Sequence, residues 1–219
     1  MTAPSNPKPT RQAGRPRSEE SRTSILDAAF SSLQRGPVSE ISTIQIARNA
    51  GVSTATVYRW WPTKEALLLD AVLNTVDHEL ILKTDGVPLE RLKDYVLQVG
   101  RLFTGANGLV VTRLLTAIQD NATLRSEFSK RAYSPREKEF RAIVKEAIRR
   151  GDLPAELKIG LFLDSIVGPL LARLLIRHER IDESFVAAVF DQVVAGAAAQ
   201  WAQGGKSRGP GNRTPASTC

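Results

Sequence analysis

Apolar residues recur at helical spacing along most of the chain, and no strand-like alternation or internal repeat is visible. The first such segment runs from about Glu19 to Gln34 and ends at Gly36-Pro37. Its apolar line comprises Ile25, Leu26, Ala29, Phe30 and Leu33. The pattern predicts an all-α protein that begins with one amphipathic helix.

The next apolar residues predict a short helix that ends in a tight turn. Ser42 and Gln45 fit a capping box at the start of this helix. Gly51 supplies the left-handed residue that ends it, and Val52 is the apolar residue that the turn tucks back between two helices.

A second short helix follows, and it is polar and aromatic. Ser53 or Thr54 caps it, and Pro62 limits it to about Trp61. Two short helices joined in this way are typical of a helix-turn-helix, whose second helix enters the DNA major groove. The alternative interpretation is a plain helical hairpin within an all-α protein.

The rest of the chain predicts longer helices separated by Gly- and Pro-containing breaks. Asp85–Pro88 is one break and Gly105–Gly108 another, the latter resembling a hinge, while Pro135 predicts a kink or a restart. Asp182 is expected to cap the last helix. The expected helices cover about residues 63–82, 89–103, 109–118, 122–150, 155–177 and 183–201.

These elements predict four segments. Residues 1–17 form a disordered basic arm, 18–65 a helix-turn-helix DNA-binding domain, 66–202 a helical regulatory and dimerisation domain, and 203–219 a disordered tail. The chain of 219 residues is long enough to bury a core in a small and a larger helical domain.

Charge favours a polyanionic partner. The net charge is +7, and residues 1–65 hold nine Lys or Arg against five Asp or Glu, a net of +4. The single cysteine, Cys219, excludes an internal disulfide and suits a reducing cytosol. The N-terminus lacks the apolar run of a signal peptide, and apolar stretches such as Ile166–Ile176 are expected to be too short to span a bilayer. We therefore expect a cytoplasmic, nucleoid-associated protein without a membrane partner.

Enzyme chemistry is poorly supported. Two histidines and one cysteine cannot form a His/Cys zinc cage, so no metal or cofactor is expected. Nucleophile-elbow, P-loop and strand-led dinucleotide-binding motifs are also missing.

Three pieces of the chain resemble the DNA-binding domain of the tetracycline-repressor (TetR) family of bacterial transcription regulators. They are the arm Gly14–Arg17 (GRPR), the helix before Gly36, and residues 41–72, ISTIQIARNAGVSTATVYRWWPTKEALLLDAV. The resemblance implies DNA contacts at matched positions. Together with the exposed hydroxyls of the second helix, the candidates are Arg15, Arg17, Thr43, Ser53, Thr54, Thr56, Tyr58, Arg59, Trp60 and Lys64.

Different roles are expected within this set. Hydroxyls at the start of the second helix contact phosphates or base edges, and Lys64 contacts a phosphate beside helix amides. Arg15 and Arg17 reach into a minor groove, with a solvated basic tail as the alternative. Trp60-Trp61 departs from the usual His-Phe or Tyr-Phe pair, so Trp61 keeps a packing role while Trp60 stacks or donates one hydrogen bond.

The last two helices are apolar on more than one face, so other elements have to cover them. The resemblance implies that the same pair of helices from a second subunit covers them, in a four-helix interface of a homodimer that reads a palindromic operator. An ordinary internal core is the alternative. The candidate dimerisation residues are Phe162, Val167, Leu170, Leu174, Phe190, Val193, Val194 and Ala197.

The resemblance also implies a small apolar or amphipathic effector inside the body, which releases a repressor from its operator. Plain core packing is the alternative for each lining candidate. A DNA-binding architectural or partner-controlled factor without an effector is the alternative for the whole protein. The candidate lining residues are Phe103, Leu114, Leu115, Phe128, Tyr133, Phe140, Phe162 and Ile166.

Overall fold

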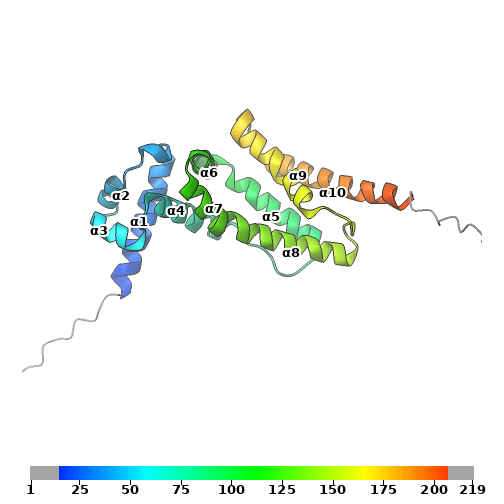
Figure 1. Cartoon of the computed structure of the whole chain (residues 1–219), viewed down its shortest axis with the longest axis horizontal. Coiled ribbons are helices and arrows are strands. Elements are labelled where there is room, and N and C mark those ends of the chain that lie inside the picture. Colours follow the sequence, from blue (N-terminus) through cyan, green and yellow to red (C-terminus); the bar gives the residue numbers. More distant parts are fainter. Residues whose placement is uncertain (1–14, 207–219) are drawn as a thin grey trace, which may run out of the picture.

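The computed structural model describes residues 15–206, with side chains from 19 to 199 (Figure 1). Every regular element in this part of the chain is helical, which confirms the all-α class. The α-helices are α1 (Arg15–Arg35), α2 (Thr43–Asn49), α3 (Thr54–Trp60), α4 (Lys64–Glu79), α5 (Pro88–Leu102), α6 (Gly105–Asp120), α7 (Ala122–Phe128), α8 (Ser134–Arg150), α9 (Ile159–Leu171) and α10 (Glu183–Lys206). A 3-10 turn, η1 (Val38–Glu40), and two π-helical segments, η2 (Ser129–Tyr133) and η3 (Ala172–Arg177), complete the list.

The first four helices form a head at one end of the molecule, and α5 to α10 form an elongated body (Figure 1). Two hydrophobic clusters hold them together. One contains buried residues of α1 to α4 together with Val110, Leu114 and Ile118 of α6 and Leu124 of α7. The other joins α5, α8, α9 and α10. The expected domain boundary at residue 65 therefore crosses a single continuous core.

Side-chain caps are present at the starts of α3, α4 and α10, and those of α3 and α10 were predicted from the sequence. The Ser53 and Thr63 hydroxyls accept hydrogen bonds from the amides of Thr56 and Ala66, each at 3.1 Å. Asp182 accepts from the amide of Phe185 at 2.8 Å. The expected capping box at Ser42 is wrong: its side chain makes no cap hydrogen bond, and Gln45 reaches forward to the Asn49 side chain instead.

An α-helix restarts at Pro135, as the sequence predicted. The chain passes from α7 through the π-helical turn η2 into α8, where Pro135 lies in the first turn. A proline has no N–H to donate and crowds the preceding turn. A wider π-helical turn immediately before it allows the segment to remain helical.

Gly105–Gly108 forms the first turn of α6 rather than a free hinge. Gly105 has a positive φ of 57° and so sets the direction in which α6 starts. A Cβ added to Gly108 would lie 2.4 Å from the carbonyl oxygen of Phe103. The glycines therefore allow a sharp corner between α5 and α6, which fixes the position of α6.

Ile159–Arg177 is one continuous helical run, as the expected helix over about residues 155–177 predicted, but its apolar stretch is longer than expected. By length and composition alone it would suffice to cross a membrane, a property that core helices of soluble proteins share. Only 22% of its apolar window is buried within the chain. This helix therefore leaves an apolar face uncovered.

The ends of the described region lie slightly beyond the predicted boundaries. Residues 15–17 belong to α1 and residues 203–206 to α10, so these positions are helical where disorder was expected. Residues 1–14 and 207–219 of the predicted arm and tail lie outside the described residues.

Gly100 gives a test of the packing between α5 and α10. A Cβ at this position would lie 2.6 Å from Val186 Cγ2, a contact that real Cβ atoms do not make. Gly100→Ala should therefore lower the free energy of unfolding by about 1–3 kcal/mol, because overpacking shifts one helix from the other. Denaturant unfolding followed by circular dichroism measures the change.

Gly160→Ala is the matched control, since the atom nearest to an added Cβ there is the end of the Arg141 side chain at 3.5 Å. It should leave stability unchanged or raise it slightly. Equal effects of the two substitutions would contradict the close approach of α5 to α10.

Candidate functional site

α3 presents most of its surface to solvent. Val57 is 1% exposed and fixes which side of α3 faces the core. On the other side Tyr58 is 50% exposed, and Arg59 is exposed without an ion pair to any described residue. The Ser53 and Thr56 hydroxyls lie 2.9 Å apart at the N-terminus of the helix. The surface thus combines hydroxyls, a phenol and a cation, which suits phosphates and base edges.

The other predicted DNA contacts differ in accessibility. Thr54 is half-buried at the start of α3, and Thr43 is only 8% exposed at the start of α2. The Thr43 side chain therefore offers little surface to a partner. Arg15 and Arg17 lie in the first turn of α1, and their side chains are outside the described residues.

Trp60 lies differently from the sequence expectation. It is half-buried and packs against the head cluster, and its Nε1 is buried without a hydrogen-bond partner in the described structure. An indole N–H in this position cannot donate to a phosphate. Trp61, by contrast, is 3% exposed and keeps the packing role that the sequence indicated.

Lys64 lies at the junction of head elements rather than free in solvent. Its Nζ donates a hydrogen bond of 3.0 Å to the carbonyl of Val38 in η1. An ammonium has three donors, so the other two remain for a phosphate beside the first turn of α4.

Asp70 of α4 links three elements, and the sequence analysis missed it. Its Oδ2 accepts a hydrogen bond from Trp61 Nε1 at 2.7 Å, and its Oδ1 accepts one from Arg131 of η2. Arg22 of α1 lies 4.0 Å away and stacks over the Trp61 ring, with its Cζ 5.8 Å from the ring centroid. The available signal was a lone acid within the apolar run Ala66–Val72, because a charge there needs partners.

Two further contacts join the body to the head. Arg136 of α8 pairs with Asp77 of α4, with Nη2 and Oδ1 2.5 Å apart. Arg113 of α6 donates to the carbonyl of Leu33 in the last turn of α1. The carbonyls at a helix C-terminus lack partners within the helix, and a cation there is favourable. The head is therefore held by charged contacts from η2, α6 and α8.

The residues predicted to line one ligand cavity do not come together. Leu114, Leu115 and Phe128 belong to the head cluster, whereas Phe103, Phe140, Phe162 and Ile166 belong to the body cluster. Phe140 and Phe162 do meet, with ring centroids 6.4 Å apart, and Tyr133 is 47% exposed at the surface. Burial and the neighbouring Glu137 raise the pKa of Tyr133, so its hydroxyl is neutral at physiological pH.

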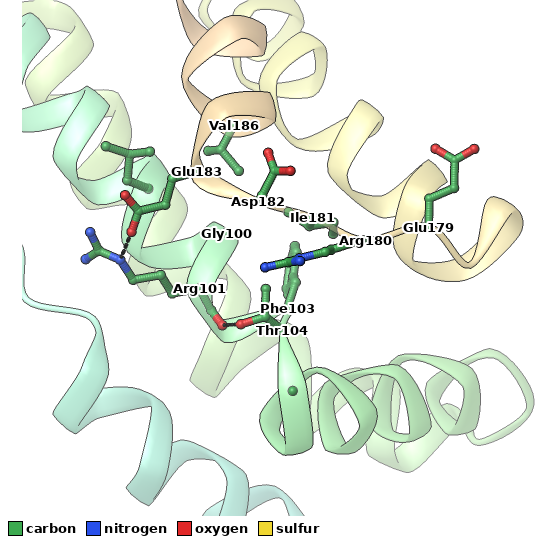
Figure 2. A pocket seen from close by; sticks show the side chains of 12 residues that line it. Gly100, Arg101, Phe103, Thr104, Glu179, Arg180, Ile181, Asp182, Glu183 and Val186 are labelled. Carbon is green, nitrogen blue, oxygen red and sulfur yellow. Dashed lines mark hydrogen bonds and ion pairs between the residues drawn. The ribbon is translucent and has the colours of Figure 1, made fainter.

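A pocket of about 550 Å³ lies between the end of α5, the start of α6 and the loop that leads into α10 (Figure 2). Of the predicted lining residues only Phe103 borders it. Its rim carries both charges, from Arg101, Arg180, Glu179, Asp182 and Glu183.

The predicted dimerisation residues fall into two groups. Four of them are buried by their own chain, and four are half-buried, which leaves each of these partly available to a partner. The first group is Phe162, Leu170, Phe190 and Ala197, and the second is Val167, Leu174, Val193 and Val194. Leu161, outside the predicted set, is 63% exposed.

Comparisons with known proteins agree with this geometry. Residues 25–71 match the family described as bacterial regulatory proteins, tetR family, and residues 85–193 match the tetracyclin repressor-like C-terminal domain. The HTH-type transcriptional regulator YdeS of Bacillus subtilis is 31% identical over 173 residues, which cover 79% of this chain and 87% of that protein. The regulator EthR of Mycobacterium tuberculosis is 37% identical over 73 residues, which cover 32% of this chain and 34% of that protein.

Solved structures show the same fold. The TetR family transcription regulator SCO0332 has a TM-score of 0.66 and 26% identity, over 81% of this chain and 98% of that one. FadR from Bacillus subtilis, in complex with stearoyl-CoA, has a TM-score of 0.67 and 20% identity, over 80% of this chain and 98% of that one. The chain belongs to the TetR family of bacterial transcription regulators and is a helix-turn-helix DNA-binding protein.

Proposed function

We propose that the protein represses nearby genes as a homodimer on a palindromic operator and is released by a small molecule. The single observation that carries DNA recognition is the exposed surface of α3, with Tyr58 at 50% exposure and Arg59 without an ion pair to a described residue. In this proposal Ser53, Thr54 and Thr56 approach base edges. Tyr58 and Lys64 contact phosphates, which position the helix without reading sequence.

A second copy of the chain covers α9 and α10 in this proposal. Leu161, Ser165 and Gly168 of α9 follow one helical face and remain at least partly exposed. On α10 a parallel stripe of exposed residues comprises Ala188, Gln192, Ala195 and Ala199. Small residues permit close helix approach, and an isologous contact between these faces gives the two-fold symmetry of a palindrome. In this proposal the interface lies on a different face of α9 and α10 from the four predicted residues that the chain itself buries. These are Phe162, Leu170, Phe190 and Ala197.

Release by an effector requires that the body and the head move together. Asp70, Asp77 and Leu33 in the head each hold an arginine from η2, α8 or α6. A ligand that shifts these body elements changes the position of α3, provided that it binds the two arrangements with different affinity. The stearoyl-CoA complex of FadR shows that a protein of this fold holds an amphipathic molecule, which supports an effector of that kind here.

Selection from a random pool of DNA duplexes tests the proposed recognition. Wild-type protein at near-physiological salt should recover a two-fold symmetric motif. Arg59→Ala should weaken binding to that motif by about tenfold or more, because a base or phosphate contact of an arginine contributes about 1–3 kcal/mol.

Arg149→Ala is the control, because it removes an equal charge from an exposed position at the far end of α8. It should lower affinity only slightly. Salt-sensitive binding without any recovered motif would instead favour an architectural factor, and equal losses in the two variants would exclude a specific role for Arg59.

Asp70 is expected to stabilise the packing of α3 against α4. Asp70→Ala leaves the buried Trp61 N–H without its acceptor, so the free energy of unfolding should fall by about 1–3 kcal/mol. Asp70→Asn keeps an acceptor and should cost less. Asp27→Ala on the exposed side of α1 is the control.

Denaturant unfolding and operator affinity are measured for all three variants. If Asp70→Ala and Asp27→Ala have the same free energy of unfolding, the contacts of Asp70 with Trp61 and Arg131 do not stabilise the head. A loss of operator affinity in Asp70→Asn that Arg131→Gln reproduces would assign that part of the effect to the ion pair.

The proposed dimer face is tested by Ala195→Glu on α10. A carboxylate at the centre of a close helix contact is unpaired and desolvated, so the variant should sediment as a monomer at micromolar concentration. Ala142→Glu, at an exposed site of α8, is the matched control and should remain a dimer. A dimeric Ala195→Glu variant would place the interface elsewhere.

A further inference from the structure

The pocket beside the loop 178–182 has an apolar floor and a charged rim. Leu97 and Phe103 supply half-buried apolar surface, Ile181 and Val186 lie buried behind it, and Gly105 leaves open space beside it. Its volume of about 550 Å³ falls within the roughly 300–1,000 Å³ typical of small-molecule sites. An occupant of this pocket needs an apolar part that fits the floor and a polar group that suits the rim.

The three acids of the rim already have partners. Glu183 Oε1 pairs with Arg101 Nε at 2.7 Å, and Glu179 Oε1 pairs with Arg177 Nη2 at 2.6 Å. Asp182 accepts hydrogen bonds from the Ser184 hydroxyl and from the Phe185 amide, and these bonds hold the pKa of its carboxyl below the usual value. Arginines balance the charges of Glu183 and Glu179, whereas the carboxylate of Asp182 stays charged and is used to cap α10.

Arg180 is different. Its guanidinium makes no hydrogen bond or ion pair with a described residue and acts on Asp182 only at longer range. Figure 2 shows it directed from the loop toward the end of α5, above Thr104, whereas the Glu179 carboxylate points away from the pocket. A cation that borders apolar side chains and has no ion-pair partner among the described residues is available to an anionic ligand.

The backbone of this loop is held so that Arg180 stays in place. Arg173 Nη1 donates to the Arg180 carbonyl at 2.9 Å, and the Arg173 guanidinium carbon lies 3.5 Å from the centroid of the Phe185 ring. His178 takes a left-handed conformation with φ of 52°, which turns the chain sharply after η3. The cation is thus presented from an ordered loop, which lowers the entropy cost of binding.

The pocket connects to the DNA-binding head through α6. Thr104 and Gly105, at the start of α6, border the pocket. Further along the same helix Val110, Leu114 and Ile118 are buried in the head cluster, and Arg113 holds the end of α1. A helix of 16 residues is about 24 Å long, so a small rotation at one end displaces residues at the other.

We propose that this pocket is the effector site and that it binds an amphipathic anion, a carboxylate or phosphate on an apolar body. The anion pairs with Arg180, and the apolar body lies on Phe103 and Leu97. Occupancy displaces the start of α6 and thereby the head. The claim that the bound anion is the effector rests on the proposed function. The claim that the pocket binds an amphipathic anion does not.

Four probes with eight carbons each and different head groups test the ligand class. Octanoate, octyl phosphate, octylammonium and octanol are titrated into the full-length protein by calorimetry. Binding of octanoate or octyl phosphate at least tenfold tighter than of octanol and octylammonium is expected, and the stronger of the two anions identifies the head group. Equal binding of all four probes, or none, would overturn the proposal.

Arg180→Gln should weaken the favoured anion at least tenfold and leave octanol unchanged, because it removes the charge and keeps most of the side chain. Arg149→Gln is the matched control and should bind like wild type. Thr104→Trp should fill the pocket entrance and weaken all probes. An unchanged anion affinity in Arg180→Gln would show that the anion binds elsewhere and would overturn the assignment.

Operator binding in the presence of the anion separates the pocket from the proposed function. Release of DNA from wild type but not from Arg180→Gln supports both. Anion binding that depends on Arg180 without any change in operator affinity keeps the binding site and excludes its role as effector site. A different ligand that releases DNA equally from wild type and Arg180→Gln keeps the repressor and overturns the assignment of this pocket.

Discussion

The head depends on apolar residues that the body supplies. Val110, Leu114 and Ile118 of α6 and Leu124 of α7 lie in the same buried cluster as the core of α1 to α4. Removing α6 from this cluster would expose apolar surface on both sides, which costs about 25 cal/mol per Å². The head therefore cannot reorient independently of α6. A regulator built in this way couples its DNA-binding surface to its body through the hydrophobic effect, before any specific polar contact is considered.

Polar contacts also join the head to the body. Trp61, at the end of α3, donates to Asp70, and Asp70 holds Arg131 in the π-helical turn η2. Such turns depart from regular α-helical geometry and are common at functional sites. Because η2 lies between α7 and α8, the Arg131 side chain connects both helices to Asp70. The apolar core keeps the head attached, and Asp70 holds the end of α3 against α4 and η2.

The body carries two different surfaces, an exposed helical face and a pocket. α9 and α10 carry an exposed face of apolar and small residues, suited to a second copy of the chain. The loop before α10 presents Arg180 to a pocket beside the end of α5 and the start of α6. The proposed dimer contact involves α9 and α10, whereas the proposed ligand contact involves this loop and the start of α10. In a symmetric dimer, each pocket would lie near an element that also sets the distance between the two heads.

The sequence by itself determined the elements whose signals are local. The periodicity of Ile25 to Leu33, the glycine at position 51 with its φ of 68°, and the caps at Ser53 and Thr63 are each decided within a few residues. The resemblance over residues 41–72 likewise indicated an exposed α3 with Tyr58 and Arg59 on its surface.

Only the tertiary structure decided which apolar residues share a cluster and which polar groups meet. Leu114 and Phe140 both occupy apolar positions of predicted helices, and the sequence does not separate them. They lie in different hydrophobic clusters because the corner at Gly105–Gly108 directs α6 toward the head. Asp70 and Arg131 are 61 residues apart, and Arg101 and Glu183 are 82 apart. Periodicity indicates which face of a helix is buried, but not which partner buries it, because that depends on how all helices pack together.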